Sequence, residues 1–488
     1  MNHYQFLIPL ITLLLGIFFM AGTEILGDEK SGEIPWLVHA FVLALAFFQQ
    51  AMLYRMPPTL FVRGGMSLDG VTQLFSCAIL ILALITQLNR RDERRSLSSQ
   101  INILSLGTVV FSLVAIQSNR FLFGIISLLG MIWTSQSALA AESDPRGQPA
   151  LVHSAIIRGL VFLVGGVFLC LLALSTFGET QIDEIQRMIV RAHFRDEPLF
   201  ALEIFITFLA AFTMGIPPFQ GLFGSSRQKA SWSLSIGLGG VFAVTGMSLF
   251  VRWGLVVFSR VAIGGLELEP LTNLNIFLVI RVLSSTALVL CPFLSLSNRN
   301  LRGSFLIFML NPFIQCLFAF SFGQKETLAH GMVDILVSVF VLGMMISSAQ
   351  SLNLTHDTSL QDWTGVGRRN RSGTLGLLIA LAGEAGFAPF YGSLLVQKTL
   401  SINSWHVIFL LLNMALSGFY VARLVALAFH RGSALGFERG SGEPVFAPES
   451  PRKMWFALQF VLLIFIGIFW QPLYKYGAFS IRSFFGEI

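Results

Sequence analysis

Charged side chains are scarce in this sequence: Asp, Glu, Lys and Arg make up 12% of its 488 residues, whereas 54% are hydrophobic. The mean hydropathy is +0.73, and uninterrupted apolar runs recur along the whole chain. Such runs exclude a soluble globular domain, because a run of about 18 or more apolar residues is long enough to cross a bilayer. The sequence therefore predicts an all-α integral membrane protein.

Cysteine is scarce too, and the usual motifs of nucleotide and metal chemistry are missing. The four cysteines stand singly in apolar runs, without the spacing of metal ligands, at positions Cys77, Cys170, Cys291 and Cys316. We expect them to pack as small hydrophobic side chains. The sequence has no P-loop, dinucleotide fingerprint, HExxH motif or hydrolase elbow. It therefore indicates no catalytic, cofactor-binding or metal site within this chain.

Hydropathy divides the chain into about fourteen expected transmembrane helices. The spans are 5–22, 35–54, 70–88, 101–117, 120–140, 155–177, 200–223, 232–258, 274–295, 303–322, 329–350, 373–399, 405–428 and 454–474. The first span lacks a small-residue cleavage site of the A-x-A kind, so we interpret it as a helix rather than a signal peptide. We expect one polytopic domain over 1–488.

The net charge of +6 is a topology signal and does not indicate a nucleic-acid partner. The loops after odd-numbered helices hold 17 Lys and Arg residues, and the loops after even-numbered helices hold 9. Cytoplasmic loops are enriched in these residues. The bias predicts that both termini lie on the periplasmic side of a bacterial inner (plasma) membrane. The outside loop 178–198 has apolar residues at helical spacing, which predicts an amphipathic helix on the membrane surface or against a neighbouring subunit.

Prolines interrupt two of the apolar spans. Pro217 and Pro218 lie within the run 199–223, and Pro389 lies within the run 375–396. Proline removes a backbone donor and clashes with the preceding turn, so we expect each helix to break there. Broken helices at membrane depth are typical of ion and substrate paths. The alternative is a pair of kinks that serve only packing.

A few ionisable side chains lie within the expected spans and are candidates for a proton pathway. His330 and Asp334 are one turn apart on one helix face, so they could relay protons or form a satisfied polar pair. Glu384 precedes the Pro389 break. Lys398 lies near the outside end, where it could also reach the membrane surface. Arg252, within the span 232–258, is the fifth candidate.

Two further charged side chains carry open alternatives. We expect Arg281 either to reach the membrane surface or to pair with a neighbour. Asp69 stands at a helix entrance, where a carboxylate suits the positive end of the helix dipole. For Asp69 we prefer this structural role.

Four features of the sequence can be compared with known families: LQDWTGVGRR at 360–369, AGFAPFYG at 385–392, FTMGIPPFQ at 212–220 and the arginine Arg252. They resemble motifs of the antiporter-like membrane subunits of bacterial NADH–quinone oxidoreductase (respiratory complex I), subunit N above all. The resemblance covers nearly the whole chain. It implies two inverted five-helix repeats with helices 7 and 12 broken, N-terminal helices over 1–117, antiporter-like halves over 118–258 and 259–428, and a last loop and helix over 429–488.

The resemblance also implies a function for the chain. It would be a non-redox subunit of a proton-translocating complex, embedded in lipid beside other membrane subunits. NADH, flavin, iron–sulfur clusters and quinone are then expected in partner subunits, and no nucleic acid is expected.

The charges of the family's first half are missing. Thr213 and Ala243 stand where the family has lysines in helices seven and eight, no acidic residue occurs between Arg120 and Ala141, and Lys398 lies two residues beyond the matching position. Neither threonine nor alanine can carry a proton by titration. Either water and other residues conduct, or the chain does not pump. The alternatives are a cation/proton antiporter or membrane-bound hydrogenase subunit, and a purely structural membrane subunit.

Overall fold

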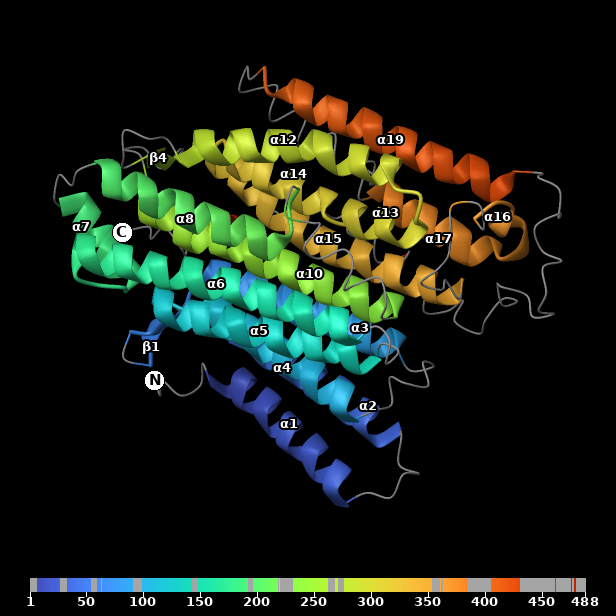
Figure 1. Ribbon diagram of the computed structural model, residues 1–488, viewed down its shortest axis with the longest axis horizontal. Coiled ribbons are helices and arrows are strands. Elements are labelled where there is room, and N and C mark those ends of the chain that lie inside the picture. Colours follow the sequence, from blue (N-terminus) through green and yellow to red (C-terminus); the bar gives the residue numbers. More distant parts are fainter. Residues whose placement is uncertain are drawn as a thin grey trace.

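The computed structural model is an all-α bundle, as the sequence predicts (Figure 1). It describes residues 7–26, 33–53, 59–62, 64–90, 99–142, 148–191, 196–217, 219, 231–261, 268–270, 276–352, 360, 363–383, 405–430, 461, 475 and 478–479. Among these residues, ten helices are long and apolar enough to span a membrane, and three shorter apolar helices accompany them. The count of fourteen helices and the repeats stay predictions.

The N-terminal part contains six long helices and a surface helix. They are α1 (Ile8–Leu26), α2 (Glu33–Met52), α3 (Gly70–Asn89), α4 (Ser99–Gln117), α5 (Phe121–Glu142), α6 (Gln148–Phe177) and α7 (Ile182–Arg191). The chain reverses between α4 and α5 over only three residues, and α7 lies in the loop where an amphipathic helix was expected. Its apolar residues Ile182, Ile185 and Ile189 are buried, which confirms an amphipathic helix there.

The central and C-terminal parts contain the broken helices. They comprise α8 (Asp196–Met214), α10 (Trp232–Leu249), the π-helix η4 (Phe250–Leu255), α11 (Val256–Phe258), α12 (Ile276–Ser297), α13 (Leu301–Phe308), α14 (Asn311–Phe320), α15 (Lys325–Ser351), α16 (Val366–Arg369), α17 (Arg371–Ala382) and α19 (Val407–Phe429). The expected spans 232–258 and 303–322 are both present, as Trp232–Leu255 and Leu301–Phe320, but neither is one regular α-helix. The first changes to a π-helix at Phe250, and the second divides at Met309–Leu310, where Pro312 lies at the start of α14.

Two short hairpins cap one end of the bundle, and the sequence did not predict them. β1 (Thr59–Phe61) pairs with β2 (Met66–Leu68), and β3 (Ser259–Val261) pairs with β4 (Leu268–Pro270), both antiparallel. The first hairpin is tied to the α4–α5 junction, where the backbone N–H of Asn119 donates to the Gly65 carbonyl at 2.9 Å. These contacts hold the ends of the helices in register.

Helix α10 forms the centre of the bundle (Figure 1). It packs against α3, α8 and α15, and every residue from Trp232 to Leu255 is buried. Glycines make this possible, since a Cβ at Gly237 would collide with Thr86 and one at Gly240 with Leu82. Small residues allow close approach of helices in membranes. At the periphery, side chains such as Phe18, Phe41 and Phe419 are exposed by 65–73%, as expected for surfaces that face lipid.

Candidate functional site

The helix that carries Pro217 ends before that proline. α8 stops at Met214, and Gly215 adopts a left-handed backbone with φ of 72°, a conformation that glycine takes without steric cost. Pro217 follows in a buried turn. Pro218 lies outside the described residues, and so do Glu384, Pro389 and Lys398.

The second-half pair His330 and Asp334 lies on α15, one helical turn apart. His330 is 2% exposed, and Asp334 is half-buried. The hydroxyl of Ser338 donates to the backbone carbonyl of Asp334 at 2.6 Å, which fixes the next turn of the helix. Whether this pair relays protons stays a prediction.

Arg252 lies on the π-helix η4, and π-helical turns are frequent at functional sites. Its Nη1 atom donates to the Ile116 carbonyl at 2.7 Å, its Nη2 donates to the hydroxyl of Ser67, and Nη2 lies 3.6 Å from Asp69 Oδ2. Asp69 is also the N-cap of α3 and accepts a hydrogen bond from the backbone N–H of Thr72 at 2.8 Å. The helix-entrance role expected of Asp69 is thus present, and Arg252 joins η4, α3 and α4.

A second buried ion pair lies at the other end of α3. Arg90, at the end of α3, lies 3.1 Å from Glu142 at the end of α5, and both side chains are under 5% exposed. Glu142 also accepts hydrogen bonds from Ser231, the N-cap of α10, at 2.9 Å from the hydroxyl and 3.0 Å from the backbone N–H. Both charges lie outside the apolar spans of the sequence, so hydropathy does not predict this pair.

Arg90, Glu142 and Ser231 form a polar cluster, and Arg302 extends it into the second half of the chain. At the start of α13, it donates to the carbonyl of Ser231 at 3.1 Å and to the hydroxyl of Ser235, and its guanidinium lies 5.7 Å from the ring centre of Trp232. The adjacent Asn300 caps α13 by accepting from two backbone N–H groups. The cluster therefore connects α3, α5, α10 and α13 at one end of the bundle.

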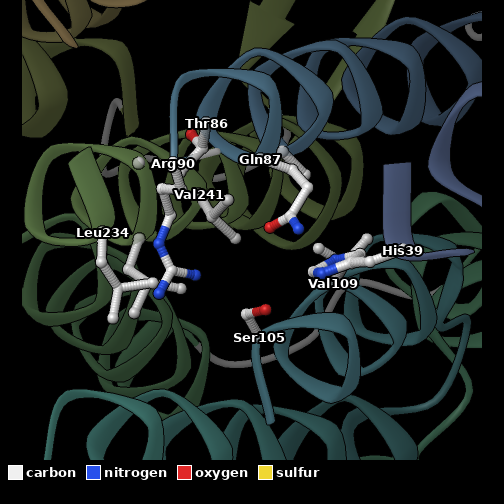
Figure 2. A pocket seen from close by; sticks show the side chains of 11 residues that line it. His39, Thr86, Gln87, Arg90, Ser105, Val109, Leu234 and Val241 are labelled. Carbon is white, nitrogen blue, oxygen red and sulfur yellow. The ribbon is translucent and has the colours of Figure 1, made fainter. Parts of the chain in front are cut away.

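A small cavity lies beside Arg90, between α2, α3, α4 and α10 (Figure 2). Figure 2 shows His39, Gln87, Arg90 and Ser105 around the same space, whose volume is about 20 Å³. His39 Nδ1 is 3.1 Å from Asn102 Oδ1, which also accepts from Gln87 at 3.1 Å. A polar cavity of this size can hold one water molecule. The sequence did not point to His39, because the span 35–54 around it is mostly apolar and has no motif.

The second half contains a neutral polar cluster where its helix divides. Asn413 on α19 donates to the carbonyl of Leu288 and to Asn311 Oδ1, both at 2.6 Å, and accepts from Gln315 at 3.1 Å. Asn311 is the first residue of α14, directly after the break. Polar side chains can satisfy backbone groups that a broken helix leaves unpaired. An asparagine followed by proline inside an apolar span is the signal that could have predicted it.

Arg281 pairs within the protein, which is one of the two alternatives expected for it. Its Nη2 atom donates to the carbonyl of Ser321 at 2.8 Å, and the guanidinium lies 4.6 Å from the ring centre of Phe322. At the two first-half positions where the family has lysines, the side chains of this chain are packed inside the protein. The hydroxyl of Thr213 donates to the Leu209 carbonyl at 2.7 Å, and Ala243 is fully buried.

The described part of the chain brings together no group of three or more metal-ligating side chains, and the four cysteines form no disulfide. What it does contain is a set of buried polar residues at the ends and breaks of membrane helices. Such an arrangement can hold water and transmit charge or hydrogen-bond changes between helices.

Solved structures with this fold come from multi-subunit membrane complexes. A chain of respiratory complex I from Thermus thermophilus with bound aureothin matches with a TM-score of 0.74 and 14% identity, over 96% of this chain and 99% of that chain. A chain of the membrane-bound sulfane sulfur reductase, an archaeal respiratory membrane complex, has a TM-score of 0.78 and 14% identity over 98% and 97%. A chain of the Mrp complex from Dietzia sp. DQ12-45-1b has a TM-score of 0.78 and 11% identity over 99% and 98%.

No protein-family model and no curated protein sequence matches the chain. The class that the fold defines is a polytopic, all-α membrane protein with the same fold as these chains. The resemblance to the membrane subunits of complex I is thus confirmed at the level of the fold.

Proposed function

We propose that the chain is a non-redox membrane subunit of a respiratory complex that couples electron transfer from NADH to quinone with proton translocation. The observation that carries the proposal is the match to a chain of complex I over nearly the full length of both chains. The motifs at 212–220 and 360–369 support it. Its partners would be further membrane subunits and lipid, and its termini would face the periplasm of a bacterial cell.

Under this proposal, protons pass through the second half by way of His330, Asp334, Glu384 and Lys398. The support is the closure of the first-half positions, where Thr213 bonds to its own helix and Ala243 is packed. Arg252 would act by holding η4 against α3, since its donors are occupied by carbonyl and hydroxyl oxygens and lie near Asp69.

Two alternatives share the fold. The similarity to the Mrp complex favours a subunit of a cation/proton antiporter or a related hydrogenase complex. The absence of titratable side chains at Thr213 and Ala243 favours a structural subunit that translocates nothing.

Deleting the gene and measuring inverted membrane vesicles separates the respiratory subunit from the antiporter subunit. We expect NADH oxidation by quinone, and the proton uptake that accompanies it, to fall in the deletion strain and to return with the wild-type gene. Loss of sodium/proton exchange with unchanged NADH oxidation would support the antiporter instead. A deletion strain with both activities unchanged would contradict the proposal.

The proton path itself is tested in the complemented strain by removing titratable side chains; Glu384→Gln also keeps the side-chain shape. Glu384→Gln, and the double variant His330→Ala with Asp334→Asn, should each lower the number of protons moved per electron, because neither variant can pass a proton at those positions. A complex that pumps with an unchanged ratio in both variants would exclude the second-half path and favour the structural subunit.

A further inference from the structure

A carboxyl group of α8 is buried apart from every site described above. Glu203 is fully buried, and within the described part of the chain neither of its carboxyl oxygens has a hydrogen-bond partner. It lies seven residues after Asp196, about 10 Å along the helix. An ionised carboxylate without a partner is strongly disfavoured in such a place, so the neutral, protonated form is preferred.

Glu203 belongs to the face of α8 that packs against α10. Thr207, Ala210 and Met214 follow it at spacings of four, seven and eleven residues, which places all four on one stripe. A Cβ built on Gly246 of α10 would meet the Ala210 carbonyl oxygen and Met214. The stripe that contains Glu203 therefore faces the centre of the bundle.

The opposite face of α8 packs against α6 through aromatic rings. The ring of Phe205 lies 4.9 Å from that of Phe168, and the ring of Phe212 lies 5.0 Å from that of Phe162. These contacts separate Glu203 from the lipid-facing side of α6.

A second unpaired polar atom lies on the same stripe of α8. Thr207 Oγ1, one turn from Glu203, is also buried without a hydrogen-bond partner among the described residues. Beyond α10 the chain continues into η4, which also packs against α8. A carboxyl and a hydroxyl that are both buried and unpaired at one helix contact are the kind of polar groups that bind a buried water molecule.

The charged groups on the helices around α8 do not neutralise Glu203. α10 contributes no titratable side chain over Trp232–Leu249. Arg252 of η4 makes its contacts with Ser67, Asp69 and the α4 end. On α6, the buried Arg158 lies one turn before Phe162. The ring of Phe162 contacts the ring of Phe212, which lies nine residues after Glu203 on α8.

We propose that Glu203 is a proton-binding site in the first half of the chain, and that it exchanges its proton beside Thr207, along the contact of α8 with α10 and η4. The inference rests on the proposed function in one respect: it supplies the titratable group that Thr213 does not. Its proton occupancy, however, is a property of the chain that can be measured without turnover.

Infrared difference spectroscopy on the purified complex measures that occupancy directly. We expect a carbonyl band of a protonated carboxylic acid that shifts on transfer from water to deuterium oxide and is lost in Glu203→Gln. The matched control is Glu184→Gln, because Glu184 is an exposed carboxylate of the neighbouring α7, with 43% of its side chain accessible. The control should leave the band unchanged.

A second variant keeps the inference testable if Glu203→Gln fails to assemble. Thr207→Val preserves shape but removes the nearest hydroxyl, so the band should remain and its shift in deuterium oxide should slow. Absence of the band in the wild-type complex, a band that does not shift, or a band retained in Glu203→Gln would overturn the inference. None of these results depends on whether the complex oxidises NADH, so they are distinct from failure of the proposed function.

Discussion

At the scale of single residues, the buried charges of this chain fall into paired and unpaired groups. Arg90 is paired with Glu142 and Arg252 with Asp69. Glu142 also accepts a hydrogen bond from Ser231, and Arg252 donates one to the Ile116 carbonyl of α4. Such bonds offset part of the cost of removing charge from water. We interpret the two pairs as clamps between helix ends. Glu203 differs because its carboxyl oxygens have no partner among the described residues.

Breaking the Arg90–Glu142 clamp should be costly. Arg90→Met alone leaves Glu142 as an uncompensated buried charge, and removal of one partner of a buried pair costs about 3–5 kcal/mol. The double variant Arg90→Met with Glu142→Leu should recover much of that loss. Thermal unfolding of the solubilised complex gives the comparison.

The control is the pair formed by Arg187 and Glu184 on α7, whose side chains are 58% and 43% exposed. Arg187→Met should cost less than about 1 kcal/mol, since exposed ion pairs contribute little. Equal losses at the two pairs would show that the burial of Arg90 is not what makes its pair important.

At the scale of elements, hydropathy predicted the helices better than their interruptions. Most spans agree with the sequence prediction to within a few residues, because a long apolar run leaves the backbone no alternative to a helix in lipid. The π-helix at Phe250–Leu255 carries no proline or glycine pair that would distinguish it from the α-helix before it. The α13–α14 break was not predicted, although Pro312 marks it. Proline is tolerated in the first turn of a helix, and Pro312 lies in the first turn of α14.

The contact of α5 with η4 offers a test of packing. A Cβ on Gly124 would collide with the ring of Trp253, whereas a Cβ on Gly254 would meet nothing within 4 Å. Gly124→Ala should therefore destabilise the assembled protein by about 1–3 kcal/mol, as overpacking does. Gly254→Ala should leave the thermal midpoint unchanged or raise it. Equal effects of the two substitutions on the midpoint would contradict the arrangement of η4.

The neutral cluster at the α13–α14 break should matter for stability more than its lack of charge suggests. Asn413→Leu would remove the hydrogen bonds that Asn413 makes with Asn311, Gln315 and the Leu288 carbonyl, at about 1–3 kcal/mol for each buried group left unsatisfied. Thr286→Val on the lipid-exposed face of α12 is the control and should be nearly silent. A thermal midpoint that is the same in both variants would show that the cluster does not hold the break.

At the scale of the whole molecule, the fold could be predicted from the sequence and much of the site could not. The motif at 212–220 led to the correct fold. Thr213 and Ala243 showed that the first half lacks the lysines of the family. Hydropathy assigns charges near span ends to loops, so it could not show that Arg90 and Glu142 meet inside the bundle. Such contacts depend on how helices distant in sequence pack.

Membrane orientation is a separate prediction of the charge bias. Glu184→Cys on the surface helix α7 should react with a membrane-impermeant maleimide in intact cells, whereas Arg94→Cys, in an expected cytoplasmic loop, should react only after permeabilisation. The four native cysteines lie within helices and should contribute little labelling. The opposite pattern would invert the orientation and place the termini in the cytoplasm.

The proposed function requires that the chain is one subunit of a larger membrane complex. The most direct measurement is purification of the tagged chain from its native membrane in mild detergent, followed by mass spectrometry and sizing. We predict a stable complex that contains further membrane subunits and redox subunits with NADH–quinone activity. A chain that purifies without partners and catalyses ion exchange by itself in liposomes would contradict the account.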